Sequence, residues 1–270
     1  MKYSFYIFSV LLFFSCEEAL IMNELLSDGG GEQIPITTLL DSELNFTSST
    51  ISLNWVGNDY AFKFNHRLEP LSYLDSVTTY TEWSGWDSLI TVTYDNLDEG
   101  NYNFYIKSRF TLDIEETPKK IPFSVNAITG PALRIYPLYQ TVSPGSSFDV
   151  LIYVEEVESI AGIEVHLSYE SSLLEFSGLT KGEMLISAPI FFNQTNSDNG
   201  TIDITTIVDD FIIEDSLIYS GTGEIAKLTF TAPSTIGSTE IEILGTSVLR
   251  DSENTSIEIL ENVSGTIQVQ

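Results

Sequence analysis

The chain has little cysteine, little histidine and little positive charge. Its 270 residues include one cysteine, two histidines and 11 Lys plus Arg against 39 Asp plus Glu, a formal net charge of −28. One cysteine excludes an internal disulfide, a cysteine-based zinc site and a dithiol redox pair. The negative charge repels phosphate backbones, so we expect no nucleic-acid partner, and it opposes close approach to anionic lipid headgroups. It also favours weak divalent-cation binding, although a solvated acidic surface is the simpler interpretation.

Catalytic motifs are equally scarce. His66 and His166 each occupy an alternating strand position in different parts of the chain, and no Gly-x-Ser-x-Gly elbow is present. Because acids are abundant throughout, paired carboxylates do not identify a glycosidase. The two glycines of residues 221–226 open a strand rather than a helix, which disfavours a phosphate cradle. We therefore expect no enzyme, no catalytic residue, no metal site and no cofactor. At the turn-rich segment 196–201, a hairpin turn and a calcium site both remain open.

Residues 1–16 read as an export signal. Lys2 precedes an apolar run from Phe5 to Phe14, which has the length of a signal-peptide core. The small residue Ser15 then precedes Cys16. This order resembles a bacterial lipoprotein signal, in which the cysteine is lipidated and anchors the mature protein to a membrane; Phe13 stands where the usual pattern has Leu. An ordinary secretory signal peptide with an incidental cysteine is the second interpretation. Both interpretations predict an exported protein.

Residues 34–128 read as a β-sandwich, after a tether over residues 17–33 in which three consecutive glycines give flexibility. Short runs such as Ile51, Leu53 and Trp55 alternate between turn signals, with no helical period. Leu97, a Gly turn and Tyr102 form the pattern of a tyrosine corner, in which the Tyr hydroxyl bonds to upstream backbone. On these residues the module resembles the fibronectin type III group of Ig-like sandwiches.

Two tryptophans in the segment WSGWDS leave a second function open. Trp83 and Trp86, with Tyr80, are candidate platforms for sugar rings if they are exposed. Packing in the core or between the modules is the other interpretation, and it is favoured because such modules need large core aromatics. An adhesive or carbohydrate-binding surface lipoprotein, with polysaccharide as its partner, is therefore the alternative function.

Residues 131–270 form a second β module, which starts after Gly130 and Pro131. The stretches SPGSSFDVLIYV, AGIEVHLSYESSLLEF and GTGEIAKLTFTA follow one another in an order and spacing that resemble a cohesin domain. The resemblance implies a nine-stranded jelly-roll sandwich with no active site. The predicted fold class is therefore all-β, with two β-sandwich domains in series.

The cohesin resemblance also implies a protein partner. One outer sheet face of a cohesin docks a dockerin, a small module of two calcium-loaded helical repeats, so calcium would sit on the partner. The resemblance implies that Glu164, His166 and Ser168 lie on the polar side of one strand of that sheet, and that Asp203 and Thr205 lie on a neighbouring strand. The candidate docking residues are Glu164, His166, Ser168, Asp203, Thr205, Asp209, Asp210 and Phe211. We expect a cell-surface anchoring scaffold that recruits a dockerin-bearing exported protein, such as a secreted hydrolase of polysaccharide catabolism.

Overall fold

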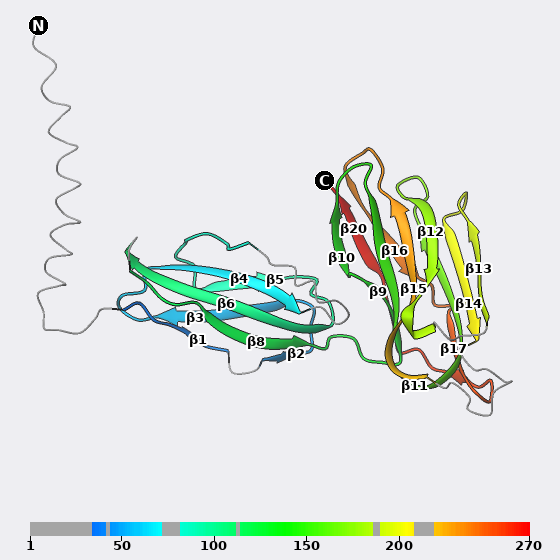
Figure 1. The fold of residues 1–270 in the computed structure, drawn as a ribbon, viewed down its shortest axis with the longest axis horizontal. Helices are drawn as coiled ribbons and strands as arrows, with labels where there is room; N and C mark the ends of the chain where they lie inside the picture. The colour runs from blue at the N-terminus through cyan, green and yellow to red at the C-terminus, as the bar shows by residue number, and fades with distance from the viewer. Residues whose placement is uncertain (1–33, 42–43, 72–81, 112–113, 186–189, 208–218) are drawn as a thin grey trace, which may run out of the picture.

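The structure is a computed structural model that describes residues 34–41, 44–71, 82–111, 114–185, 190–207 and 219–270. Within these ranges it consists of strands and one short 3-10 turn. The strands form two units that follow one another along the chain, as Figure 1 shows. The predicted all-β class is therefore confirmed. Cys16 and Tyr80 lie outside the described residues, as do Asp209, Asp210 and Phe211.

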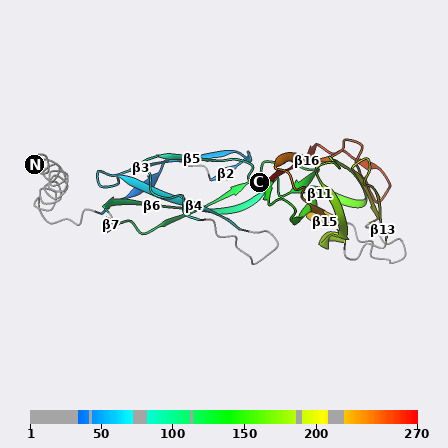
Figure 2. The same ribbon diagram turned by 90° about the horizontal axis from the view of Figure 1, so that it is seen from above.

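The N-terminal unit is a sandwich of two sheets that lie one over the other in Figure 2. The smaller sheet has the order β1-β3-β5 and comprises β1 (Thr37–Leu39), β3 (Ile51–Gly57) and β5 (Thr91–Tyr94). The larger sheet has the order β2-β8-β6-β4, with β7 paired to β6. It comprises β2 (Asn45–Phe46), β4 (Lys63–Leu71), β6 (Gly100–Thr111), β7 (Ile114–Glu115) and β8 (Lys119–Val125).

Alternating apolar side chains of both sheets make the core of this unit. Leu53 and Trp55 of β3 are buried against Phe104 and Ile106 of β6, because residues two apart in a strand point to the same face. Tyr102 is also buried, and its hydroxyl donates a hydrogen bond of 2.8 Å to the backbone oxygen of Asp98. This bond is the predicted tyrosine corner.

The C-terminal unit contains β9 to β20 and is also a two-layered sandwich. Its first layer is built on β9 (Ala132–Tyr136), β12 (Glu175–Lys181), β15 (Tyr219–Thr231) and β19 (Glu261–Val263). Its second layer is built on β10 (Tyr139–Val142), β13 (Ile190–Asn196), β14 (Thr201–Ile207), β16 (Gly237–Ile243), β17 (Val248–Asp251), β18 (Ser256–Ile257) and β20 (Gly265–Val269). The 3-10 turn η1 (Glu183–Leu185) follows β12.

One long strand, β11 (Ser147–Tyr169), belongs to both layers. Its first part pairs with β9 and β15, and its last part pairs with β14, β16 and β17. The pairing with β15 slips around Val157, where Glu156 and Ser159 adopt positive φ angles of 49° and 56°. Bulges of this kind bend a strand, so β11 leaves one layer and enters the other without a loop. Side-chain oxygens of Thr222 and Ser220 accept hydrogen bonds from the amides of Glu156 and Ser159.

Alternation along β11 fills the core between the layers. Phe148, Val150, Ile152 and Val154 are all buried, as expected for one face of a strand. β13 and β14 are joined by a tight turn, which confirms the hairpin over residues 196–201. Gly200 has a positive φ of 65° in this turn, and an added Cβ would lie 2.0 Å from a backbone oxygen. Only glycine fits there.

Candidate functional site

The outer face of β11 and β14 carries the predicted polar residues in paired rows. Antiparallel register places Glu164 opposite Thr205 and His166 opposite Asp203, and it also brings Ser168 onto this face. The intervening residues of β11 point inward and are buried, so the polar set points outward. The structure therefore brings five of the predicted site residues together. We call this surface, together with the outward side chains of β13 and β16, the outer face.

The pair at the centre of the outer face is in direct contact. His166 Nδ1 lies 2.6 Å from Asp203 Oδ1, and the two side chains are 31% and 44% exposed. A partner can therefore reach both. The amide of His166 donates to Ser247 Oγ at 3.0 Å, and Ser168 Oγ donates to the Glu242 carboxylate at 3.3 Å. These bonds fix polar groups on a rigid sheet, which lowers the entropy cost of recognition.

The edge strand β13 adds apolar side chains that the sequence did not reveal. Phe192 lies opposite Thr205 and is 62% exposed, while Ile190 lies opposite Ile207 and is 49% exposed. Gln194 lies opposite Asp203. Two adjacent phenylalanines in FFNQTN gave no indication of which ring faces outward, since that depends on the register with β14. The outer face thus combines polar side chains at its centre with exposed apolar side chains at its margin, and protein interfaces contain both kinds of group.

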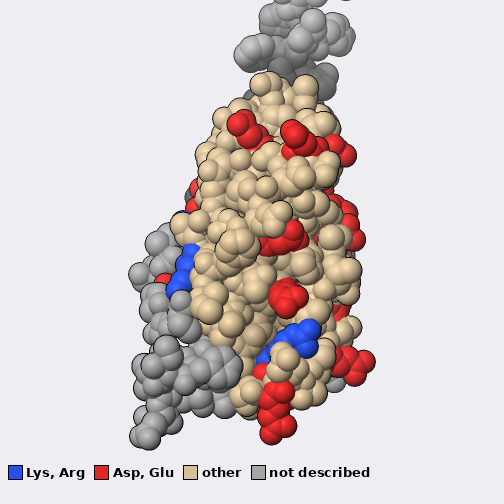
Figure 3. Space-filling model, turned by 90° about the vertical axis from the view of Figure 1, so that its right-hand side faces the viewer, with Lys and Arg blue, Asp and Glu red and all other residues tan. Residues whose placement is uncertain are grey.

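A hollow of about 260 Å³ lies at one end of the outer face. Gly162 and Glu164 line it from β11, Thr205 from β14 and Arg250 from β17. Gly162 has no side chain, which leaves space between its neighbours. Figure 3 shows the side of the molecule that bears β13, where acidic side chains are scattered over a mostly uncharged surface. The hollow is large enough to receive one side chain of a partner.

The tryptophans of WSGWDS do not pack in the core or between the units, so the favoured prediction was wrong. Both are half-buried on the outer side of the β4–β6 sheet. Trp83 contacts Arg67 and Lys107, and Trp86 contacts Lys107 and Arg109, with cation-to-ring distances of 4.5–5.2 Å. Such cation–π contacts hold the segment against the sheet.

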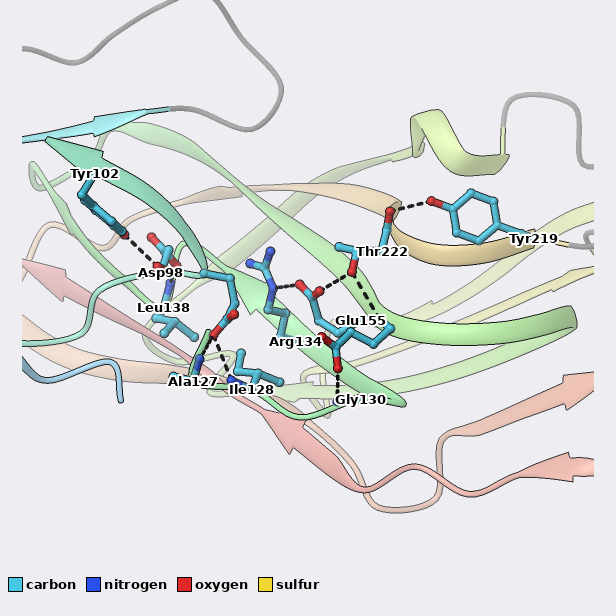
Figure 4. Close-up of polar contacts among 12 residues, drawn as sticks. Asp98, Tyr102, Ala127, Ile128, Gly130, Arg134, Leu138, Glu155, Tyr219 and Thr222 are labelled. Atoms are coloured by element: carbon cyan, nitrogen blue, oxygen red, sulfur yellow. Dashed lines mark hydrogen bonds and ion pairs between the residues drawn. The ribbon is translucent and has the colours of Figure 1, made fainter. Parts of the chain in front are cut away.

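Carboxylates of the N-terminal unit bind the linker and the second unit, as Figure 4 shows. Asp98 Oδ1 accepts a hydrogen bond of 2.7 Å from the amide of Leu138. Glu99 Oε1 accepts bonds of 2.6 and 2.9 Å from the amides of Ala127 and Ile128. Burial raises the pKa of Asp98 to about 6, and it also raises the pKa of Glu99. These bonds link the two sandwiches, and we call this region the junction.

Arg134 occupies the centre of the junction. It is 4% exposed and bonds through Nε to Glu155, whose other oxygen accepts a bond of 2.6 Å from Thr222 Oγ1. Its guanidinium lies 4.5 Å from the ring centre of Tyr153. Its Nη1 is buried and has no hydrogen-bond partner among the described residues. Arg134 is also one of the residues that line a hollow of about 270 Å³ between the units.

The described part of the chain contains neither a metal-binding cluster nor a membrane-spanning helix. No cluster of three or more His, Cys, Asp or Glu side chains suited to a metal ion occurs among those residues. Within the same ranges, no helix is both long enough and apolar enough to cross a bilayer.

The geometry defines a class of protein: a two-unit all-β chain with a rigid, accessible sheet face. Comparison with known families makes the C-terminal unit more specific. Residues 139–269 match the model of the cohesin domain, so this unit is a cohesin domain, as the sequence predicted. Cohesin domains are non-catalytic binding modules.

The chain is similar to one curated relative and to several solved cohesin structures. Cellulose-binding protein A of Clostridium cellulovorans is 25% identical over 182 residues, which cover 67% of this chain and 9% of that protein. The sixth cohesin of scaffoldin B from Acetivibrio cellulolyticus, solved in complex with a Cel5 dockerin, is 22% identical. It covers 53% of this chain and 100% of its own, with a TM-score of 0.46. A non-cellulosomal cohesin from Archaeoglobus fulgidus is 17% identical, covers 52% and 90%, and has a TM-score of 0.42.

Proposed function

We propose that this chain is a cell-surface anchoring scaffold whose cohesin domain binds a dockerin-bearing exported protein through the outer face. The observation that carries the proposal is the paired polar rows of β11 and β14, bordered by Phe192, on a domain of the cohesin family. Solved cohesins such as that of Acetivibrio cellulolyticus scaffoldin B were crystallised with a dockerin. A similar partner suits this face because a rigid sheet holds its polar and apolar contact groups in place before binding.

Each part of the outer face has a chemical role in this proposal. The carboxylates of Glu164, Asp203 and Glu242 accept hydrogen bonds from Lys, Arg, Ser or Thr side chains of the partner helix. Phe192 and Ile190 lose water on contact and supply the apolar anchor. Asp209, Asp210 and Phe211 belong to the same proposal, although they lie outside the described residues.

The other segments would set the distance between the outer face and the membrane. A lipidated Cys16 would hold the chain on a membrane, residues 17–33 would act as the tether, and residues 34–128 would serve as a fibronectin-like spacer. The junction bonds of Asp98 and Glu99 support a fixed angle between spacer and cohesin domain. A recruited protein, such as a polysaccharide hydrolase, would then be held at a set distance from the cell.

The test is capture of exported proteins on the immobilised mature chain, with mass spectrometry of what is retained. We expect the retained proteins to carry dockerin repeats and to be released by a calcium chelator. Glu164→Lys and Asp203→Lys should weaken capture, whereas Asp149→Lys should not, because Asp149 is an exposed acid on the first part of β11, outside this face. Retention of polysaccharide alone, or equal loss with all three variants, would contradict the proposal.

A further inference from the structure

Exposed apolar side chains gather at one end of the N-terminal unit. Among the described residues, nine of the fourteen large exposed hydrophobic side chains belong to this unit. Several of them lie where β3 ends and β4 begins, on the left in Figure 1 and away from the junction. We call this region the distal end. It comprises Ile34, Ile36, Val56, Tyr60, Phe62, Phe110 and Ile114.

Hydrogen bonds and ring contacts show that these residues are neighbours. Asn58 joins them from one side: its amide donates to the oxygen of Ile36, and its Nδ2 donates to the oxygen of Ile34. On the other side, the amide of Phe62 donates to the oxygen of Arg109. The ring of Phe110 lies 5.4 Å from that of Phe62 and 5.8 Å from that of Tyr60. Phe62 nevertheless remains 56% exposed, so this cluster is not a closed core.

The charges beside the distal end differ from those of the whole chain. Lys63 and Arg109 lie opposite each other on β4 and β6 and flank the aromatic cluster, in a chain with a net charge of −28. Glu115 is paired with Lys107, while Glu116 is buried and bonded to Thr37 and Ser108. Aromatic rings beside long cationic side chains are typical of surfaces that sit at the headgroup level of a bilayer.

We propose that the distal end rests on the headgroup region of the membrane that carries the protein. This inference depends on the proposed lipidation of Cys16, because that anchor would bring the distal end to a bilayer. Ile34, the first described residue, lies in the cluster and follows Cys16 by eighteen positions. A segment of this length spans at most about 60 Å, so the distal end can reach the surface without a fully extended tether.

Contact at the distal end would orient the whole chain. β6 runs from Gly100, beside the junction, to Thr111 at the distal end, and its 12 residues cover about 40 Å. With the distal end on the lipid surface, the N-terminal unit would stand upright and hold the cohesin domain about that far from the membrane. An exposed acid, Asp59, lies in the same loop, so the contact should be with zwitterionic rather than strongly anionic lipid.

The test uses the mature chain from Glu17 to Gln270 without its lipid, which keeps every residue that the structure describes. Its partition onto sucrose-loaded vesicles of phosphatidylcholine is measured by sedimentation. We expect measurable binding that falls about fivefold with Phe62→Ser and with Ile36→Ser, because membrane affinity follows the apolar area buried. Ile236→Ser is the matched control: Ile236 is 75% exposed on the other unit, and its loss should change binding by less than about twofold.

Two further measurements separate membrane contact from misfolding and from loss of docking. Tryptophan fluorescence reports folding of the N-terminal unit, which holds all three tryptophans. If Phe62→Ser unfolds this unit, the vesicle binding of Ile36→Ser alone tests the membrane contact. Capture of the dockerin-bearing protein should be unchanged in both variants, so failure of docking and failure of membrane contact are distinguishable. The inference is overturned if the unmodified chain ignores the vesicles or if Ile236→Ser reduces binding equally. It is also overturned if the chain forms dimers without vesicles that Phe62→Ser and Ile36→Ser dissociate, since a second copy would then cover the distal end.

Discussion

His166 and Asp203 face each other across β11 and β14, with Nδ1 and Oδ1 2.6 Å apart. The contact holds the Asp203 carboxylate in one position on the outer face. Its second oxygen, Oδ2, accepts no hydrogen bond from the described residues and remains available to a partner. A charged acceptor that is already fixed in place gives both strength and direction to recognition.

Replacement of Asp203 by Asn should weaken capture of the proposed dockerin-bearing partner about tenfold, or ~1.4 kcal/mol. Asn keeps the size of the side chain and an acceptor oxygen, so the loss reports the charge. The matched control is Asp149→Asn, because Asp149 also contacts a nitrogen-bearing side chain, that of Lys227 at 3.4 Å, but lies on the first part of β11. Surface plasmon resonance on both variants gives the comparison. If the two variants bind the partner with equal affinity, Asp203 is not part of the interface.

Replacement of Phe192 by Ser tests the apolar margin of the outer face. Because the ring is largely exposed, its removal should leave the melting temperature unchanged. It should reduce affinity for the partner by about 2 kcal/mol, the usual value for an interface anchor. Leu260→Ser, at a site of similar exposure (55%) away from this face, is the control. Isothermal titration calorimetry measures the affinity of both variants for the partner. If Phe192→Ser and Leu260→Ser change the affinity equally, Phe192 is not an anchor.

The sequence predicted those features that depend on neighbours in the chain. Alternation along β11 correctly indicated that Glu164, His166 and Ser168 share a face, because a strand alternates at every second residue whatever it pairs with. The tyrosine corner of Tyr102 was predictable for a similar reason, since its partner Asp98 lies four residues upstream. The order of the strand motifs also predicted the cohesin domain.

Features that depend on pairing between distant segments were missed. The ring of Phe192 faces outward because of its register with Thr205, which no local pattern encodes. Trp83 and Trp86 meet cations of β4 and β6 that lie far away in the sequence, so their placement was predicted wrongly. β11 passes from one layer to the other through bulges at Glu156 and Ser159. Neither residue is a glycine, so the pattern of the sequence does not predict a bulge there.

Stability of the junction should depend on pH through Asp98. Burial raises its pKa from 3.8 to about 6, so the folded state favours the neutral acid. The stabilising contribution is then complete below about pH 4 and is lost as the pH rises through 6, at a cost of about 3 kcal/mol. Asp98→Asn keeps the acceptor for the Leu138 amide and removes the ionisation. Unfolding followed by tryptophan fluorescence from pH 4 to 7 should therefore show a flatter profile in this variant. If the variant and the unmodified protein lose stability equally as the pH rises, the pH dependence does not come from Asp98.

The buried pair of Arg134 and Glu155 should be strongly coupled. Both side chains are almost fully buried, and Thr222 also bonds to Glu155, so removal of the cation would leave an uncompensated buried charge. We expect Arg134→Met to lower the free energy of unfolding by about 3–5 kcal/mol. Arg134→Met combined with Glu155→Gln should restore much of this loss, because no charge then remains at the site.

The comparison pair is Lys227 and Asp149, which is more exposed, with side chains 42% and 47% accessible. Lys227→Met should cost less than about 1 kcal/mol, since solvent screens such pairs. Denaturation followed by circular dichroism measures these three variants and Glu155→Gln alone, since the cohesin domain contains no tryptophan. If Arg134→Met costs no more than Lys227→Met, or if the double variant is the sum of its two single changes, the pair does not hold the junction together.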